Sequence, residues 1–115
     1  MKVYVAGPMR GLKDCNFSAF DKAADQLREQ GYTPVSPADR DRSAGFYPQT
    51  KNCEMDYLAE VGFDLKEAIM WDLNTLADCD AILLLSGWEN SSGARLERAL
   101  ADFLGLEVWL EDAGF

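Results

Sequence analysis

The chain contains no histidine among its 115 residues. This absence excludes Ser-His-Asp triads, Cys-His dyads and zinc sites built on histidine ligands. Any acid–base chemistry therefore depends on carboxylates, tyrosine, cysteine or lysine.

Long hydrophobic runs are also missing. No apolar stretch approaches the roughly 18 residues that a membrane-spanning helix needs. The first residues, Met-Lys-Val-Tyr-Val-Ala-Gly, do not combine the basic, apolar and small-residue segments of a signal peptide. We therefore expect a cytoplasmic protein with no membrane partner.

Cysteine is scarce. The three cysteines are Cys15, Cys53 and Cys79, an odd number at long spacings and without a CxxC pair. This arrangement supports neither a disulfide framework nor a metal cluster. We expect free and mostly buried thiols in a reducing compartment.

Basic residues are few. Eleven Lys and Arg stand against twenty Asp and Glu, which gives a formal net charge of −9. An acidic surface repels nucleic-acid phosphates, so we do not expect polymeric DNA or RNA as a partner. A small anion could still bind through local backbone N–H groups and one or two arginines.

The residues that are present suit one domain over residues 1–115. Apolar residues make up 48% of the chain, which is enough for a core and argues against disorder. β-prone and apolar runs predict four strands, at about residues 2–6, 32–36, 80–85 and 107–110. Apolar residues at helical spacing predict three helices, at about residues 17–30, 54–78 and 92–104.

Local signals refine these elements. Asn16 is placed to cap the first helix, Gly62 to interrupt the second and Gly105 to end the third. Residues 37–53 show no periodicity and are rich in Pro, Gly, Asp, Arg and Ser, so we expect a long loop there.

Strands that alternate with helices predict an α/β fold of the order β-α-β-α-β-α-β. Its sheet is open, parallel and of about four strands, and helices cover both faces. Ligands of such sheets bind outside the carboxyl ends of the strands. The loops expected to form a site are therefore residues 7–15, 37–53 and 86–92.

Glu97 breaks the pattern of the third predicted helix. At about 100° per residue, one face of this helix carries the four apolar residues Leu96, Leu100, Phe103 and Leu104. Glu97 projects about 60° from Leu100, at the edge of this apolar stripe. We expect a carboxylate that is partly buried or points into a cleft. The alternative is that Glu97 caps its own helix or pairs with an arginine beside the core.

Asp72 repeats this anomaly in the second predicted helix. It lies on or beside the stripe formed by Leu65, Ile69, Leu73 and Leu76. A structural role for Asp72 is an equally open interpretation.

Two loops could hold an anion. Ser91 and Gly93 lie where the third helix begins, and free N–H groups at a helix N-terminus bind anions. Ordinary capping by Ser91 or Ser92 explains the same residues. After the first strand, Gly7 and Gly11 flank Arg10, which suits close approach to a phosphate or sugar, although a tight turn with a surface arginine is the alternative.

Together these motifs resemble the nucleoside 2-deoxyribosyltransferase superfamily, in particular its small phage and bacterial branch. The resemblance extends to the related 2′-deoxynucleoside 5′-monophosphate N-glycosidases, and it covers residues 2–36 and 70–110. The matching positions, in chain order, are Tyr4, Gly7, Pro8, Met9, Arg10, Gly11, Asp72, Asp80, Ser91, Gly93 and Glu97.

The resemblance implies a flavodoxin- or Rossmann-like fold that cleaves the N-glycosidic bond of a 2′-deoxynucleoside or its 5′-monophosphate. Glu97 would attack the sugar carbon C1′, and the covalent intermediate would pass to water or to an acceptor base. Tyr4 would keep Glu97 ionised, and Asp72 would hold or protonate the leaving base. No metal or organic cofactor is implied.

The resemblance also implies how substrate and subunits meet. Arg10, Ser91 and the N–H groups near Gly93 would hold the 5′ end of the substrate. Related sites are shared between subunits, so a homodimer or higher oligomer is expected. Only residues 111–115 follow the last strand, so a fifth strand is expected to be missing. Contacts to the base or to a neighbouring site are expected either to be missing or to come from the loop over residues 37–53. Trp88 and Phe46 are candidates to stack on a base, with core or surface packing as the alternative.

Two other functions stay open at this point. The same fold could sequester a nucleotide or related metabolite without catalysis. It could also be a structural or partner-binding domain.

Overall fold

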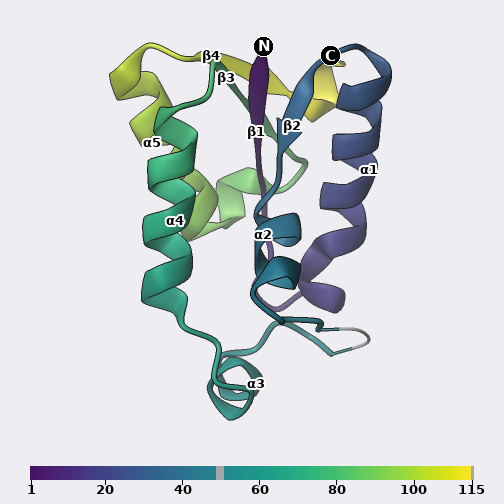
Figure 1. Cartoon of the computed structure of the whole chain (residues 1–115), viewed down its shortest axis with the longest axis vertical. Helices are drawn as coiled ribbons and strands as arrows, with labels where there is room; N and C mark the ends of the chain where they lie inside the picture. The colour runs from purple at the N-terminus through teal and green to yellow at the C-terminus, as the bar shows by residue number, and fades with distance from the viewer. Residues whose placement is uncertain (49–50, 115) are drawn as a thin grey trace.

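The computed structural model describes residues 1–48 and 51–114. Its four strands form one parallel sheet in the order β2-β1-β3-β4 (Figure 1). The strands are β1 (Lys2–Ala6), β2 (Thr33–Val35), β3 (Ala81–Leu84) and β4 (Glu107–Leu110). The predicted single-domain α/β fold with an open parallel sheet is confirmed.

Helices cover both faces of this sheet. They are α1 (Phe17–Glu29), α2 (Pro37–Ser43), α3 (Met55–Glu60), α4 (Leu65–Ala77) and α5 (Ser92–Leu104). Figure 1 shows α1 on one side of the sheet and α4 with α5 on the other. None of the helices in the described part of the chain is long and apolar enough to cross a membrane.

The central strand β1 contributes to two separate cores. Val3 and Val5 belong to the cluster that contains the buried side chains of α1, whereas Tyr4 and Ala6 belong to the cluster on the α4 and α5 side. This alternation follows from the two-residue period of a strand. It directs the Tyr4 ring, which is fully buried, towards the layer that carries the predicted carboxylates.

The strand order positions the site. From β1 the chain crosses to β2 on one side, and it later returns to β3 on the other side of β1. The loops that leave β1 and β3 therefore diverge at their carboxyl ends and open a crevice there.

The expected loop over residues 37–53 contains a helix, so this prediction was wrong for its first half. Helix α2 begins at Pro37, and the Ser36 hydroxyl accepts a hydrogen bond from the Ala38 backbone N–H at 3.2 Å. A serine cap followed by proline at the first helical position is a common start signal. The absence of apolar periodicity concealed it.

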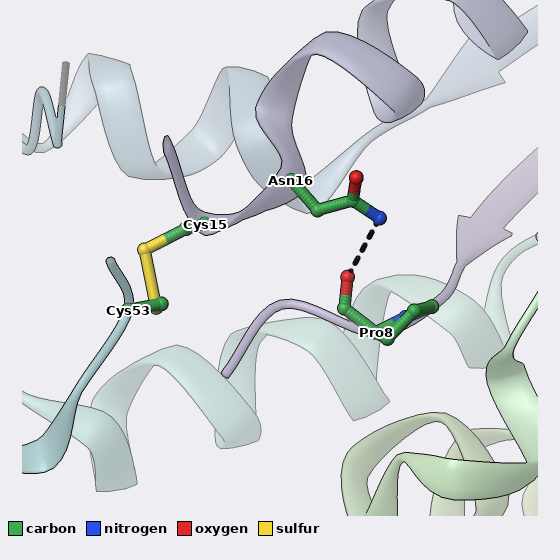
Figure 2. Close-up of a disulfide and its surroundings, with 4 residues drawn as sticks. All are labelled: Pro8, Cys15, Asn16 and Cys53. Carbon is green, nitrogen blue, oxygen red and sulfur yellow. Dashed lines mark hydrogen bonds between the residues drawn. A yellow bond between two sulfur atoms is a disulfide. The ribbon is translucent and has the colours of Figure 1, made fainter. Parts of the chain in front are cut away.

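Asn16 is the N-cap residue of α1, as its position in the sequence predicted, but its side chain makes no capping hydrogen bond. Its amide donates instead to the Pro8 carbonyl at 2.9 Å (Figure 2). Its backbone is left-handed, as are those of Asp14 and Cys15, with φ between 48° and 61°. This conformation is tolerable for Asp and Asn and unusual for Cys. It turns the loop after β1 back towards the sheet.

The expectation of three free thiols is contradicted. Cys15 and Cys53 form a disulfide across 38 positions of sequence, with 4.7 Å between their Cα atoms (Figure 2). Backbone hydrogen bonds support the link, from Asp14 N to Lys51 O and from Cys53 N to Leu12 O. Cys79 remains a free, buried thiol. Sequence spacing could not reveal the pair because the two residues meet only through the tertiary fold.

Most of the apolar face predicted for α5 does not face the sheet, although Leu100 packs half-buried against the core. Leu96 is 48% exposed and Phe103 is 86% exposed, whereas the buried residues of the helix are Ala94, Glu97 and Ala101. Small residues face the sheet because α5 lies close against it. Glu97 is therefore at the centre of the buried face, not at the edge of an apolar stripe.

Candidate active site

A cavity of about 240 Å³ opens at the carboxyl ends of β1 and β3. Its walls come from the loop after β1, helices α2 and α4, and the first turns of α5. The predicted site residues that line it are Gly7, Pro8, Met9, Arg10, Asp72, Ser91, Gly93 and Glu97. Eight of the positions chosen from the sequence thus surround one space.

Glu97 lines this cavity and is 5% exposed. Its Oε2 accepts a hydrogen bond from the Tyr4 hydroxyl, which reaches it from β1. Burial is the main reason why the pKa of Glu97 rises to about 8, with a smaller increase from Asp72, while the hydrogen bond from Tyr4 lowers it. The same surroundings raise the pKa of Tyr4 well above 10, so its hydroxyl stays protonated and acts as a donor.

Asp72 faces the same cavity from the middle of α4. Its Oδ1 is buried and has no hydrogen-bond partner within the described residues. Burial raises the pKa of Asp72 to about 7, with a further increase from Asp41, while Arg40 and the Tyr4 hydroxyl lower it. A buried oxygen without a partner is unfavourable. It therefore marks a position where a ligand could supply the missing hydrogen bond.

The N-terminus of α5 forms another wall. The Ser91 hydroxyl accepts from the Ala94 N–H at 3.1 Å, so Ser91 caps its helix as one of the two sequence interpretations expected. The first N–H groups of the helix, from Ser92 and Gly93, lie next to this cap at the cavity wall. They are the donors with which helix N-termini hold anions.

The loop after β1 approaches the β3 side closely at its first residue. A Cβ on Gly7 would lie 2.8 Å from the Cβ of Leu85, so only glycine fits there. Arg10 is exposed at the mouth of the cavity. Gly11 lies outside the cavity lining, and its N–H donates to the Cys53 carbonyl at 2.8 Å.

Asp80 does not join the site, in contrast to its predicted role in substrate binding. It precedes β3 and therefore lies at the amino end of the sheet, opposite the cavity. Its carboxylate accepts from the Lys2 backbone N–H at 2.8 Å. Its role is to join the starts of two neighbouring strands.

Sequence reasoning missed Asp41 in α2. Its carboxylate is 4% exposed and lines the cavity. Burial raises the pKa of Asp41 to about 6, while Arg40 lowers it. A helix assignment over residues 37–43 would have placed Asp41 on the same face as Pro37 and Ala38, and so would have shown a carboxylate among buried residues.

The two aromatic candidates have different positions. Phe46 lines the cavity and packs against Phe63, with 4.6 Å between ring centroids. Trp88 packs against the core on the α4 and α5 side. The Cζ atom of Arg98 lies over its ring, 5.0 Å from the ring centroid. Only Phe46 is therefore placed to meet a ligand in this cavity.

Metal-binding groups are not apparent in the described part of the chain. Over residues 1–48 and 51–114, no three Cys, Asp or Glu side chains are arranged to hold an ion. The cavity offers three carboxyl groups, from Asp41, Asp72 and Glu97, and a helix N-terminus, and a tyrosine hydroxyl is hydrogen-bonded to Glu97.

These features define an open α/β protein with a carboxylate-lined cavity at the switch point of its parallel sheet. Residues 1–110 match the family described as Domain of unknown function (DUF4406), and the chain belongs to that family. No curated protein matches the chain.

Proposed function

We propose that the protein cleaves the N-glycosidic bond of a 2′-deoxynucleoside 5′-monophosphate or its nucleoside. The observation that carries the proposal is that Glu97, held by the Tyr4 hydroxyl, lines the same cavity as Asp72, which has an unpartnered buried oxygen. Most enzymes that cleave glycosidic bonds use two carboxyl groups, one on each side of the reacting bond. The resemblance to nucleoside 2-deoxyribosyltransferases suggests the same chemistry.

In the first step, Glu97 attacks C1′ while the bond from C1′ to the base nitrogen breaks. The electron pair of that bond moves to the base, which takes a proton from Asp72. Tyr4 holds one oxygen of Glu97, so the other is directed at the sugar. The product is a deoxyribosyl ester of Glu97 and a free base.

In the second step, a water molecule attacks C1′ and gives a proton to Asp72. The ester bond breaks and Glu97 leaves as a carboxylate. An acceptor base in place of water would make the protein a transferase. In both cases Asp72 returns to its protonated state.

The reaction needs one proton on this pair of carboxyl groups, and their pKa values, about 7 for Asp72 and about 8 for Glu97, mean that the pair retains a proton near neutral pH. In the empty cavity the higher pKa of Glu97 favours the proton there. The working state has the proton on Asp72 and leaves Glu97 ionised. The Glu97 carboxylate then stabilises the positive charge that develops at C1′, and the apolar surroundings strengthen that attraction.

The 5′-phosphate would lie between Arg10 and the start of α5. The N–H groups of Ser92 and Gly93 and the guanidinium of Arg10 border the same cavity as Glu97. A helix N-terminus and an arginine together favour a doubly charged phosphate. We therefore favour a monophosphate substrate, and with it hydrolysis over base transfer.

A second candidate function is nucleotide binding without catalysis. The observation in its favour is the raised pKa of Glu97, because a carboxyl group that is protonated in the empty cavity is a weak nucleophile. A module of this kind would bind nucleotide and release no base.

We further propose that the protein forms a homodimer through the outer face of α5. Leu96 and Phe103 lie seven residues apart on this helix and are largely exposed. Exposed large apolar side chains on one helix face favour association with a partner. Light scattering after size exclusion tests this, with Phe103→Asp expected to shift the protein from dimer to monomer.

Base release separates the two functions. Deoxynucleosides and their 5′-monophosphates are incubated with the protein, with and without an acceptor base, and free base is measured by chromatography. Catalysis predicts release that Glu97→Ala abolishes and that a control at exposed Glu89, Glu89→Gln, retains. Acid quenching should also trap a sugar adduct on Glu97, detectable by mass spectrometry. Release that persists in Glu97→Ala contradicts the proposal, and tight binding with no release supports the sequestering module.

A further inference from the structure

The reaction proposed above leaves Asp41 without a role, although this carboxylate is almost fully buried in the cavity wall. Among the described residues, Arg40 is the side chain that donates to it, over a long 3.5 Å contact to Oδ1. The same guanidinium also binds Glu67 and lies over the Trp71 ring at 5.9 Å. Arg40 is therefore shared among several partners and leaves acceptor capacity on Asp41.

The strand order places Asp41 relative to the reacting groups. Asp41 lies on α2, which follows β2, and Glu97 lies on α5, which follows β3 on the other side of β1. Both side chains line the cavity, so they border it from different strands of the sheet. A ligand whose sugar meets Glu97 would therefore extend its base towards Asp41.

Apolar side chains line the cavity together with Asp41. The Phe46 backbone N–H donates to the Asp41 carbonyl at 2.9 Å, and the Phe46 ring packs against Phe63. Leu65 and Ala68 of α4 line the same cavity. Aromatic and aliphatic walls suit the faces of a planar ring. A carboxylate within such walls can accept a hydrogen bond from the edge of that ring.

We propose that Asp41 is a specificity-determining residue that selects bases with an exocyclic amino group at the edge remote from the sugar. This inference rests on the proposed function, because it takes Glu97 as the sugar end of the site. Cytosine and adenine present an amino donor at that edge. Uracil, thymine and hypoxanthine present a carbonyl oxygen, which an ionised carboxylate repels.

Two matched substrate pairs test the inference in the wild-type protein. Deoxycytidine monophosphate is compared with deoxyuridine monophosphate, and deoxyadenosine monophosphate with deoxyinosine monophosphate. Each pair exchanges an amino group for a carbonyl at the same ring position. The expected ratio of kcat/KM is about tenfold or more in favour of the amino base, since a hydrogen bond to a charged group is lost in its competitor.

The variant Asp41→Asn keeps the size of the side chain and adds an amide donor. It should reduce the preference at least about tenfold or invert it, because an amide can donate to the carbonyl base. Asp39→Asn is the matched control, since Asp39 lies on the same helix and is exposed. The control should retain the wild-type ratio.

The outcomes separate this inference from the proposed function. Base release at equal rates within both pairs, or a preference for the carbonyl base, overturns the role of Asp41 and leaves glycosidic cleavage intact. An unchanged ratio in a folded Asp41→Asn does the same. If the wild type releases no base from any substrate, cleavage fails, and the selectivity is then measured by calorimetric binding of the same four nucleotides. Equal affinities within each pair overturn it there.

Discussion

The Tyr4 hydroxyl donates a hydrogen bond to Oε2 of Glu97 across 93 positions of sequence. This contact joins the central strand of the sheet to α5 and fixes one oxygen of the buried carboxyl group. It also lowers the pKa of Glu97 against the opposing effect of burial. Tyr4 therefore acts directly on the proposed nucleophile.

Replacing Tyr4 tests this relationship. Tyr4→Phe should reduce kcat by about 10²-fold, because Glu97 loses the donor that favours its ionised form. The loss of one buried hydrogen bond should lower the free energy of unfolding by about 1 kcal/mol. Single-turnover rates and urea unfolding measure the two effects. Tyr32→Phe, at a ring that packs on Trp109 away from the cavity, should leave the rate unchanged.

Glu97→Gln should make the protein more stable at alkaline pH. The pKa of Glu97 is about 8 in the folded protein and 4.5 when the side chain is exposed in the unfolded chain, so the folded state holds an extra proton between these pH values. Wild-type stability therefore falls as pH rises through this window, and Glu97→Gln removes that loss. We expect equal stability near pH 4.5 and a gain on the order of 2 kcal/mol at pH 8.5.

Urea unfolding at both pH values measures this difference. Glu29→Gln, at an exposed position near the end of α1, should show no such pH dependence. A loss of stability in Glu97→Gln at pH 8.5 would indicate that the carboxylate is held by a structural ion pair instead.

The rate of base release should depend on pH as a narrow bell. Activity rises as Glu97 loses its proton and falls as Asp72 loses the proton that it gives to the base. Because the two groups are coupled, the rising and falling sides of the pH profile report the titration of the pair and not of either residue alone. The apparent pKa values should be about 7 and about 8. Initial rates from pH 5 to 10 measure the profile. A flat profile across that range is incompatible with these roles.

Arg10→Ala should weaken the recognition of a 5′-phosphate. We expect KM for a deoxynucleoside monophosphate to rise about tenfold, because a charge-assisted contact to phosphate is removed. KM for the corresponding nucleoside should change little. Lys13→Ala removes another exposed cation of the same loop and serves as the control. Equal effects on both substrates would place the phosphate elsewhere.

Reduction of the disulfide should destabilise the protein. A link across 38 positions restricts the unfolded chain, and a loop of that length corresponds to roughly 4 kcal/mol in the chain-entropy description. Dithiothreitol should lower the free energy of unfolding of the wild type by up to that amount. It should have no effect on Cys15→Ser/Cys53→Ser.

Thiol titration after unfolding without reductant gives an independent readout. One reactive thiol, Cys79, is expected before reduction and three afterwards. Three thiols in the untreated protein would mean that the pair is reduced as isolated. The cytoplasmic location expected from the sequence stays a prediction. It bears on this measurement because a reducing compartment would keep Cys15 and Cys53 as free thiols.

The order of strands and helices was predictable because local signals agree with the fold. The apolar run before Ser86 predicted a buried strand, and Ser91 and Gly105 marked both ends of α5. The positions of Glu97 and Asp72 were predictable as charges that interrupt a helical pattern. Both indeed border the cavity.

Tertiary relationships were not accessible in this way. The orientation of α5 was mispredicted because periodicity favours Leu96 and Phe103, whereas the close approach of helix to sheet selects Ala94 and Ala101. The disulfide and the left-handed turn before α1 depend on contacts between distant segments. Asp41 was missed because α2 is short and almost entirely polar, so no pattern existed for a carboxylate to break.

The two alanines that face the sheet from α5 have a consequence for evolution and engineering. Ala94 is 1% exposed and Ala101 is fully buried. A bulkier residue at either position would lift the helix and carry Glu97 away from Tyr4. Two of the smallest side chains in the protein thus set the spacing of helix and sheet, and a larger residue there would break the contact between Tyr4 and Glu97 without altering either of them.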